Sequence, residues 1–187
     1  MDALPPTDDG DGASDDEPGP SPAGVVILHD AWLEVPDAVP AVHRAVNAAV
    51  GFVPALADGE IAIALSSDAA VRELNARFRG SDKPTNVLSF PAAPGPAEAE
   101  AEGEAAPSGD IVIAYETILR EAEGEGKHLL HHLAHLTVHG LLHLAGYDHE
   151  DDAEAERMEA LETRILATLG IPDPYEESYR GGSAARG

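Results

Sequence analysis

The amino-acid sequence predicts a single α+β domain in which a β-sheet of about four strands packs with about five helices. Short runs of apolar or β-branched residues alternate with longer segments of helical periodicity, which is typical of a chain that mixes β and α structure. The chain has 187 residues, of which 43% are hydrophobic, so it is long enough to form one compact core. The order of the strands in the sheet does not follow from these patterns.

Each expected element follows from a local pattern. The expected strands are short apolar or β-branched runs, most of them bounded by turn-forming residues: Val25–Val35, Glu60–Leu65, Asn86–Phe90 and Asp110–Ala114. The expected helices are the segments of helical periodicity between and after those runs, at about 37–50, 68–79, 115–123, 127–145 and 151–168.

Two segments have compositions unlike that of a folded core. Residues 1–23 contain seven acidic residues and no Lys or Arg, with many Pro, Gly and Ser, so we expect a disordered acidic tail. Residues 92–108 repeat this bias between two expected strands, and we expect an acidic low-complexity loop there. The folded domain is therefore expected at 24–175, followed by a flexible C-terminal tail at 176–187.

Composition restricts the function further. The 11 basic and 35 acidic residues give a formal net charge of −24, which argues against a broad nucleic-acid-binding surface, since such surfaces are normally basic. The absence of cysteine excludes disulfides and thiolate metal ligands. The N-terminus has no basic and apolar signal segment, and no apolar run approaches the ~20 residues that span a bilayer. We therefore expect a cytoplasmic protein with no membrane partner.

Histidine is concentrated in one segment, with seven of the nine histidines between His128 and His149. In a helix, with about 100° per residue, five of them project from one face as a stripe: His128, His132, His135, His139 and His143. Taken singly, a histidine near the start of this stripe is most simply a solvated side chain or a hydrogen-bonded core residue.

Three histidines have the spacing of a metal site at the end of this central helix. His139 and His143 are four residues apart, so both side chains point the same way, one turn apart. Gly146 can adopt the left-handed conformation that ends a helix and turns His149 back toward them. Three imidazoles leave a coordination position open, as catalytic zinc sites do. We expect one divalent metal ion, most simply Zn²⁺, although nickel and copper also suit three imidazoles.

The same spacing occurs in metzincin proteases, which carry a glutamate general base directly after the first histidine. This chain has Gly140 at that position, and glycine cannot abstract a proton. The nearest acid is Asp148, which can orient a ligand or water, act directly in the chemistry, or be an ordinary solvated turn residue. We take Asp148 as a candidate catalytic residue.

The segments KPTNVLSFP, GDIVIA, HGLLHLAGYDH and RMEALETRILATLG occur in this order along the chain. With them, residues 24–175 resemble the YbeY family of endoribonucleases. The resemblance implies a mixed β-sheet covered by helices, a zinc-type site on the three histidines, and a single-strand-specific endoribonuclease that matures the 3′ end of 16S ribosomal RNA and serves ribosome quality control. It also implies single-stranded ribosomal RNA, the small ribosomal subunit, protein uS11 and the GTPase Era as partners, and no DNA.

A basic cluster stands out against the acidic background, in the segment VRELNARFRGSDK. In the family that the chain resembles, the arginine matching Arg79 belongs to the active-site cleft, which implies a catalytic role for Arg79 here. Arginine suits phosphate because its planar guanidinium donates two parallel hydrogen bonds and stays protonated. Without the resemblance, Arg79 is most simply a solvated residue at a helix end. Asn86 and Ser89, in TNVLSF, are interpreted mainly as strand residues.

Two other functions remain open at this point. One is a different metallohydrolase, such as a peptidase, which the three histidines permit and Gly140 disfavours. The other is a non-catalytic ribosome-assembly factor whose metal mainly stabilises the fold. The acidic residues that remain outside the tail and the loop further predict weak non-specific affinity for RNA, with targeting by a protein partner or the ribosome.

Overall fold

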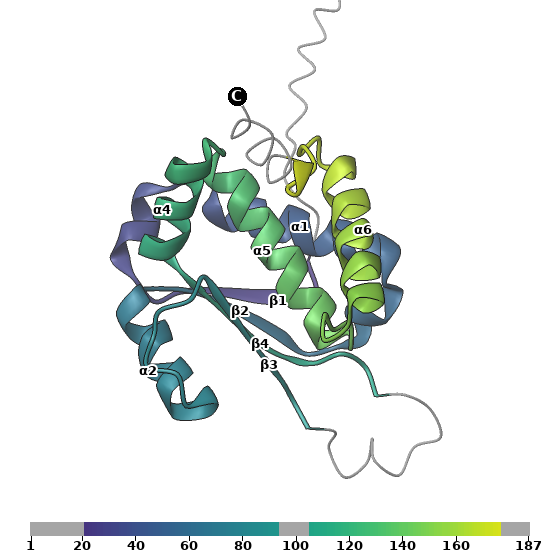
Figure 1. Ribbon diagram of the computed structural model, residues 1–187, viewed down its shortest axis with the longest axis horizontal. Coiled ribbons are helices and arrows are strands. Elements are labelled where there is room, and N and C mark those ends of the chain that lie inside the picture. Colours follow the sequence, from purple (N-terminus) through teal and green to yellow (C-terminus); the bar gives the residue numbers. More distant parts are fainter. Residues whose placement is uncertain (1–20, 94–104, 177–187) are drawn as a thin grey trace, which may run out of the picture.

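The computed structural model describes residues 21–93 and 105–176, and within them the chain forms a four-stranded sheet (Figure 1). The strands run in the spatial order β1-β2-β4-β3 and are β1 (Ala23–Ile27), β2 (Ile61–Ser66), β3 (Val87–Pro91) and β4 (Gly109–Ala114). β1 pairs with β2, and β2 with β4, in parallel, whereas β3 pairs with β4 in antiparallel. The sheet is therefore mixed, and β1 and β3 are its edge strands.

Helices cover the two faces of this sheet unequally. Figure 1 shows α2 (Asp68–Arg79) below the sheet and the other α-helices above it. Those are α1 (Ala38–Phe52), α4 (Tyr115–Glu125), α5 (Leu129–Leu144) and α6 (Asp152–Thr168). The described part of the chain also contains two 3-10 helices, η1 (Asp30–Glu34) and η2 (Pro54–Asp58). The predicted α+β class and the approximate number of elements are confirmed.

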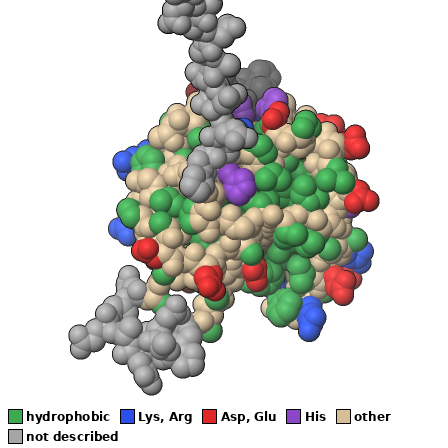
Figure 2. All heavy atoms as spheres, turned by 180° about the vertical axis from the view of Figure 1, so that it is seen from behind, with side chains coloured by type: hydrophobic (Ala, Val, Ile, Leu, Met, Phe, Trp, Pro, Cys, Tyr) green, Lys and Arg blue, Asp and Glu red, His purple; other side chains and the backbone are tan. Residues whose placement is uncertain are grey.

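Strand side chains alternate between two cores because successive residues of a strand point to opposite faces. Ile63 and Ile111 are fully buried in the large core that the sheet forms with α1, α5 and α6. Val112 points the other way and packs with Leu88 and with Val71 of α2 in a smaller core. β4 is thus buried on both faces. Seen from behind, hydrophobic side chains gather across the middle of the molecule and charged ones mainly at its rim (Figure 2).

The predicted strand Val25–Val35 is wrong in its second half. The strand ends at Ile27, and Asp30–Glu34 form η1 instead. Trp32, which is 1% exposed, explains the difference, because its indole Nε1 donates to the Ser66 carbonyl at 3.0 Å and its ring packs edge-on against Tyr115. A continued strand would carry this side chain away from those partners.

Most of the predicted tails and loop lie outside the described residues. The tail 1–23 is described only from residue 21, the loop 92–108 only at its two ends, and the C-terminal tail 176–187 only at Glu176. The ends of the loop are joined, because the Ala92 amide donates to the Ser108 carbonyl at 2.9 Å. In the described part of the chain, no helix is long and apolar enough to cross a membrane.

Candidate metal centre

The site is built on α5, whose apolar side chains fix the orientation of the helix. Leu133, Leu141 and Leu142 are fully buried in the large core. His139 and His143 are only half-buried, because they lie on another face of the same helix. The core packing of α5 therefore points these two imidazoles away from the sheet.

Gly140 brings α5 close to the sheet. A Cβ atom at this position would lie 3.0 Å from Ile111 Cγ2 and 3.2 Å from Ser89 Oγ, so a larger residue would push the helix and the sheet apart. Ser89 Oγ also donates to the Gly140 carbonyl at 3.4 Å. Gly140, which occupies the position of the glutamate general base of metzincin proteases, thus has a packing role.

The three histidines predicted as metal ligands converge. One ligand nitrogen from each lies within 4.8 Å of the other two, and among the described residues this is the one cluster of at least three His, Cys, Asp or Glu side chains that could hold a metal ion. The Nε2 atoms of His139 and His143 are 3.0 Å apart. The centres of the His149 and His143 rings are 5.0 Å apart. The left-handed turn predicted at Gly146 is confirmed by its φ of 89°.

The donor set fits a zinc-type ion. Nitrogens bound tetrahedrally at about 2.0–2.1 Å from one Zn²⁺ lie about 3.3 Å apart, close to the observed separation of His139 and His143. Metal binding also requires neutral imidazoles. Burial, together with the neighbouring His139 and His149, lowers the pKa of His143. These three side chains can therefore hold a divalent metal ion.

A buried carboxylate orients the first of these histidines. Glu162 of α6 is 0% exposed, and its Oε1 accepts a hydrogen bond from His139 Nδ1 at 2.5 Å. Because Nδ1 then carries the proton, the Nε2 lone pair of His139 is left for a metal. Burial acts to raise the pKa of Glu162, but hydrogen bonds from His135, His139 and Tyr175 outweigh it and lower the pKa to about 2. Glu162 is therefore an ionised partner of a histidine of the candidate metal site.

Two further side chains hold Glu162 in place. Its Oε2 accepts a hydrogen bond from the Tyr175 hydroxyl and lies 3.3 Å from His135 Nε2. Burial and the negative charge of Glu162 raise the pKa of Tyr175, so its phenol remains a protonated donor. His135, a member of the predicted stripe, thus contacts the buried carboxylate.

The sequence analysis did not identify Glu162 or Tyr175. One signal exists, because Glu162 falls in the buried stripe of α6 with Met158 and Ile165, at spacings of four and three residues. A carboxylate at such a position needs a buried partner. The partner itself does not follow from the sequence, since His139 lies 23 residues away on another helix.

The three histidines line a cleft of about 530 Å³ that also contains Arg79. Arg79 is the last residue of α2, and the helix ends there because Gly80 adopts a left-handed conformation with φ 67°. Its guanidinium Nη2 donates to the Ser89 carbonyl at 3.0 Å, which holds it at the cleft. The structure therefore brings Arg79 to the same cleft as His139, although the two are far apart in the sequence.

Asp148 and Asn86 line this cleft as well. The Asp148 Oδ1 accepts from the His149 amide at 2.7 Å, a contact that shapes the turn carrying the third histidine. The side-chain Nδ2 of Asn86 donates to Glu121 Oε2 at 3.1 Å, and the side-chain Oδ1 of Asn86 accepts from the backbone N–H of Val87 at 2.8 Å. These contacts suit an orienting role for Asp148 and a structural role for Asn86.

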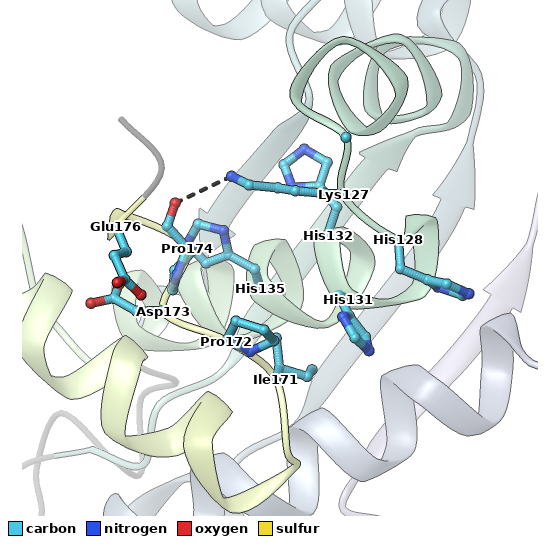
Figure 3. Close-up of a pocket in the computed structure, with 11 residues that line it drawn as sticks. Lys127, His128, His131, His132, His135, Ile171, Pro172, Asp173, Pro174 and Glu176 are labelled. Carbon is cyan, nitrogen blue, oxygen red and sulfur yellow. Dashed lines mark hydrogen bonds between the residues drawn. The ribbon is translucent and has the colours of Figure 1, made fainter. Parts of the chain in front are cut away.

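The other histidines of the segment lie toward the beginning of α5. A second pocket of about 290 Å³ is lined by His128, His131, His132 and His135. Figure 3 shows these side chains beside the chain segment that follows α6. His132 pairs with Glu121 at 2.7 Å, and His128 Nδ1 accepts a backbone amide of the first turn of α5. The Lys127 ammonium donates to the Pro174 carbonyl at 3.2 Å at one side of the pocket. These contacts agree with the interpretation of His128 and His132 as hydrogen-bonded side chains, and His131 is exposed, as expected of a solvated one.

Comparison with known proteins gives consistent matches. The family model of Endoribonuclease YbeY matches residues 32–170. Endoribonuclease YbeY of a Bradyrhizobium species is 56% identical over 157 residues, which cover 83% of this chain and 93% of that protein. The protein of the same name from a Rhodopseudomonas palustris strain is 55% identical over 160 residues, covering 83% of this chain and 82% of that protein.

A solved structure has a similar fold. The solution structure of a Thermotoga maritima protein matches 88% of this chain and 96% of its own, with a TM-score of 0.51 and 22% sequence identity. Together, the match of the family model over most of the chain and the identity to these relatives show that the chain belongs to the YbeY endoribonuclease family.

Proposed function

We propose that this chain is a cytoplasmic, metal-dependent endoribonuclease that cuts single-stranded ribosomal RNA, in maturation of the 16S 3′ end and in ribosome quality control. The relatives named Endoribonuclease YbeY support this class of reaction. The observation that carries the proposal is the convergence of three imidazoles in a cleft that also contains an arginine. A metal-ligand set beside a phosphate-binding group suits hydrolysis of a phosphodiester.

In this proposal His139, His143 and His149 hold one Zn²⁺, because three neutral imidazoles with an open position suit this ion. The chemistry that a divalent metal would supply when held there is that of a Lewis acid toward a phosphate ester and water. Glu162 keeps His139 in the tautomer that offers Nε2 to the metal.

Arg79 is proposed to bind the scissile phosphate and to stabilise the negative charge that grows on it in the transition state. Its Nη2 is held by the Ser89 carbonyl, and the remaining N–H donors of the guanidinium suit a phosphate in the cleft. Removal of one preorganised donor commonly costs about 2.7–4 kcal/mol of transition-state stabilisation. We therefore expect Arg79→Ala to slow cleavage by roughly 100- to 1,000-fold.

Asp148 is proposed to act by orientation, through the backbone of His149. Asp148→Asn keeps the Oδ1 acceptor and removes the charge, so a smaller loss of rate is expected than for Arg79→Ala. A loss as large as that of Arg79→Ala would instead assign Asp148 a direct part in proton transfer.

The strongly acidic composition, with a net charge of −24, makes tight non-specific RNA binding unfavourable. We therefore propose that the small ribosomal subunit directs the protein to its RNA, with protein uS11 and the GTPase Era as the partners that the family resemblance suggests. Residues 24–175 are proposed as the domain that carries the activity.

The test is cleavage of a single-stranded 16S 3′-end fragment by highly purified protein. Four samples are compared, with metal content determined on each: the wild type, chelator-treated protein, chelator-treated protein reloaded with Zn²⁺, and His143→Ala. His131→Ala is the matched control, because His131 is an exposed histidine of the same helix that does not line the metal cleft. Cleavage is expected to follow metal content and to be unchanged in His131→Ala.

Other outcomes would favour the alternatives. Equal cutting in all samples would indicate a contaminating nuclease and contradict the proposal. Loss of stability on metal removal, with no cleavage by any sample, would favour a non-catalytic assembly factor. Metal-dependent digestion of casein in place of RNA would favour a peptidase.

A further inference from the structure

An aromatic and basic surface extends from the cleft. Phe78, in the last turn of α2, is a large aromatic side chain that is 59% exposed. Its ring lies 5.4 Å from the Phe90 ring in an edge-to-face arrangement. The Arg77 guanidinium lies 5.2 Å from the centre of the Phe78 ring, and the Arg79 guanidinium lies 5.9 Å from the centre of the Phe90 ring. We name these four residues, Arg77, Phe78, Arg79 and Phe90, the Arg–Phe ladder.

The ladder is continuous with the metal cleft through Arg79. This side chain lines the cleft and donates to Ser89, and its guanidinium also faces Phe90. Ser89 and Phe90 are neighbours on β3, an edge strand of the sheet, so their side chains point to opposite faces. Arg79 is the side chain that contacts both sides of this edge, so an RNA strand that leaves the cleft past Arg79 would cross β3 to reach Phe78.

The ladder is also a local exception to the acidic character of the protein. In the part of the chain that the structure describes, Arg72 of the same helix forms an ion pair with Asp82 at 2.7 Å, but none of the ion pairs involves Arg77 or Arg79. Neither guanidinium has an acidic partner in these pairs, and each lies over an aromatic ring, Arg77 over Phe78 and Arg79 over Phe90. Positive charges interleaved with aromatic rings suit the phosphates and bases of a nucleic acid.

Folding accounts for Phe90 but not for Phe78. Phe90 is half-buried and packs against the smaller core. Phe78 leaves more than half of its surface in water, so it contributes little to that core. Single exposed hydrophobic side chains are common on proteins. The combination of an exposed ring with two guanidinium groups is what indicates a ligand.

We propose that the Arg–Phe ladder is a stacking platform for one unpaired base of the RNA strand whose phosphodiester lies in the metal cleft. The base stacks on the exposed Phe78 ring, and Arg77 contacts a neighbouring phosphate. An aromatic ring accepts any base that is free of a duplex, so the platform selects single strands without reading sequence. The inference rests on the proposed function for the identity of its ligand.

The test measures stacking directly. A single-stranded 16S 3′-end RNA carrying one 2-aminopurine at varied positions is mixed with zinc-loaded, full-length protein in a stopped-flow fluorimeter, and fluorescence is recorded before cleavage. Stacking of 2-aminopurine on an aromatic ring quenches its fluorescence. The variants are Phe78→Ala and Phe78→Trp, with Leu33→Ala as the control, because Leu33 is an equally exposed apolar residue, at 63%, in η1.

Phe78→Ala is expected to abolish quenching at one position and to raise Kd and KM by at least about 5-fold, the low end for one stacked base. The rate at saturating RNA is expected to be unchanged. Phe78→Trp restores both quenching and affinity, and Leu33→Ala behaves as the wild type. Arg77→Gln is expected to reduce the slope of log Kd against log salt concentration by about 0.7, as for one lost phosphate contact on a single strand.

The outcomes separate this inference from the proposed function. Metal-dependent cleavage with an unchanged KM in Phe78→Ala would overturn the ladder and leave the proposed function intact. Quenching and binding that depend on Phe78, without any cleavage, would support the ladder while the proposed activity fails. Equal loss of affinity for duplex and single-stranded RNA in Phe78→Ala would also overturn the ladder, since a duplex offers no free base.

Discussion

Replacing Glu162 with Gln tests how the buried carboxylate supports the metal site. The glutamine has nearly the same volume and can still accept a hydrogen bond from His139 Nδ1. It removes the charge that lies 2.5 Å from that atom, and it leaves one fewer acceptor for His135 and Tyr175. Loss of such a partner commonly weakens metal binding by about 10- to 100-fold, which corresponds to about 1.4–2.7 kcal/mol.

The assay is competition for Zn²⁺ between the protein and a chelating dye of known affinity. Glu156→Gln is the matched control, because Glu156 lies on the same helix, is exposed, and loses the same charge. Unfolding in urea, with the metal removed, reports whether either substitution damages the fold itself. A second variant, Tyr175→Phe, deletes only one donor to Glu162 and is expected to weaken Zn²⁺ binding less than Glu162→Gln does.

The result that refutes this reasoning is a Zn²⁺ affinity of Glu162→Gln equal to that of Glu156→Gln, in a protein that remains folded. His139 would then hold its orientation without the carboxylate. The hydrogen bond at 2.5 Å would be a feature of the buried core alone and would have no influence on the metal.

Three further predictions concern stability. Gly140→Ala is expected to destabilise the fold by about 1–3 kcal/mol, because the added Cβ would lie 3.0 Å from Ile111. Gly124→Ala in α4 is the control, since a Cβ there meets open space and the substitution is expected to be neutral or stabilising. Urea unfolding of both variants separates the effect of packing from that of glycine flexibility. A hydrogen bond from His132 lowers the pKa of Glu121 below its ordinary value of 4.5. The ionised carboxylate therefore stabilises the fold at pH values above 4.5, and this contribution is lost as the pH falls through the lowered pKa. The free energy of unfolding of Glu121→Gln is therefore expected to fall less steeply than that of the wild type in acid, and parallel curves would contradict this. Chelation of the metal is expected to lower Tm in differential scanning fluorimetry and added Zn²⁺ to restore it, whereas an unchanged Tm would argue against binding to the folded three-histidine site.

The metal-ligand candidates could be predicted because their geometry is local. His139 and His143 share a helix face through their spacing alone, and one glycine turn at Gly146 returns the chain to them. The sequence shows that Arg79 lies at a helix end, but local geometry does not place it at the cleft. That expectation came only from the family resemblance. The catalytic roles of Arg79 and Asp148 stay predictions.

Contacts between distant segments could not be predicted in this way. The strand predicted over Val25–Val35 failed because a propensity for β structure says nothing about Ser66 and Tyr115, the partners that draw Trp32 into η1. Likewise, the packing of Phe78 against Phe90 depends on α2 lying beside the edge strand β3.

Local sequence patterns were sufficient to predict the α+β class, the approximate positions of the helices and most strands, and the geometry of His139, His143 and the turn at Gly146. These features follow from backbone periodicity and glycine conformation within a few residues of chain. Such patterns do not give the strand order, the pairing of Glu162 with His139 or the position of Arg79 at the cleft, which are evident only in the folded chain. Those depend on which surfaces pack together to bury apolar area, a property of the whole chain that no single segment carries.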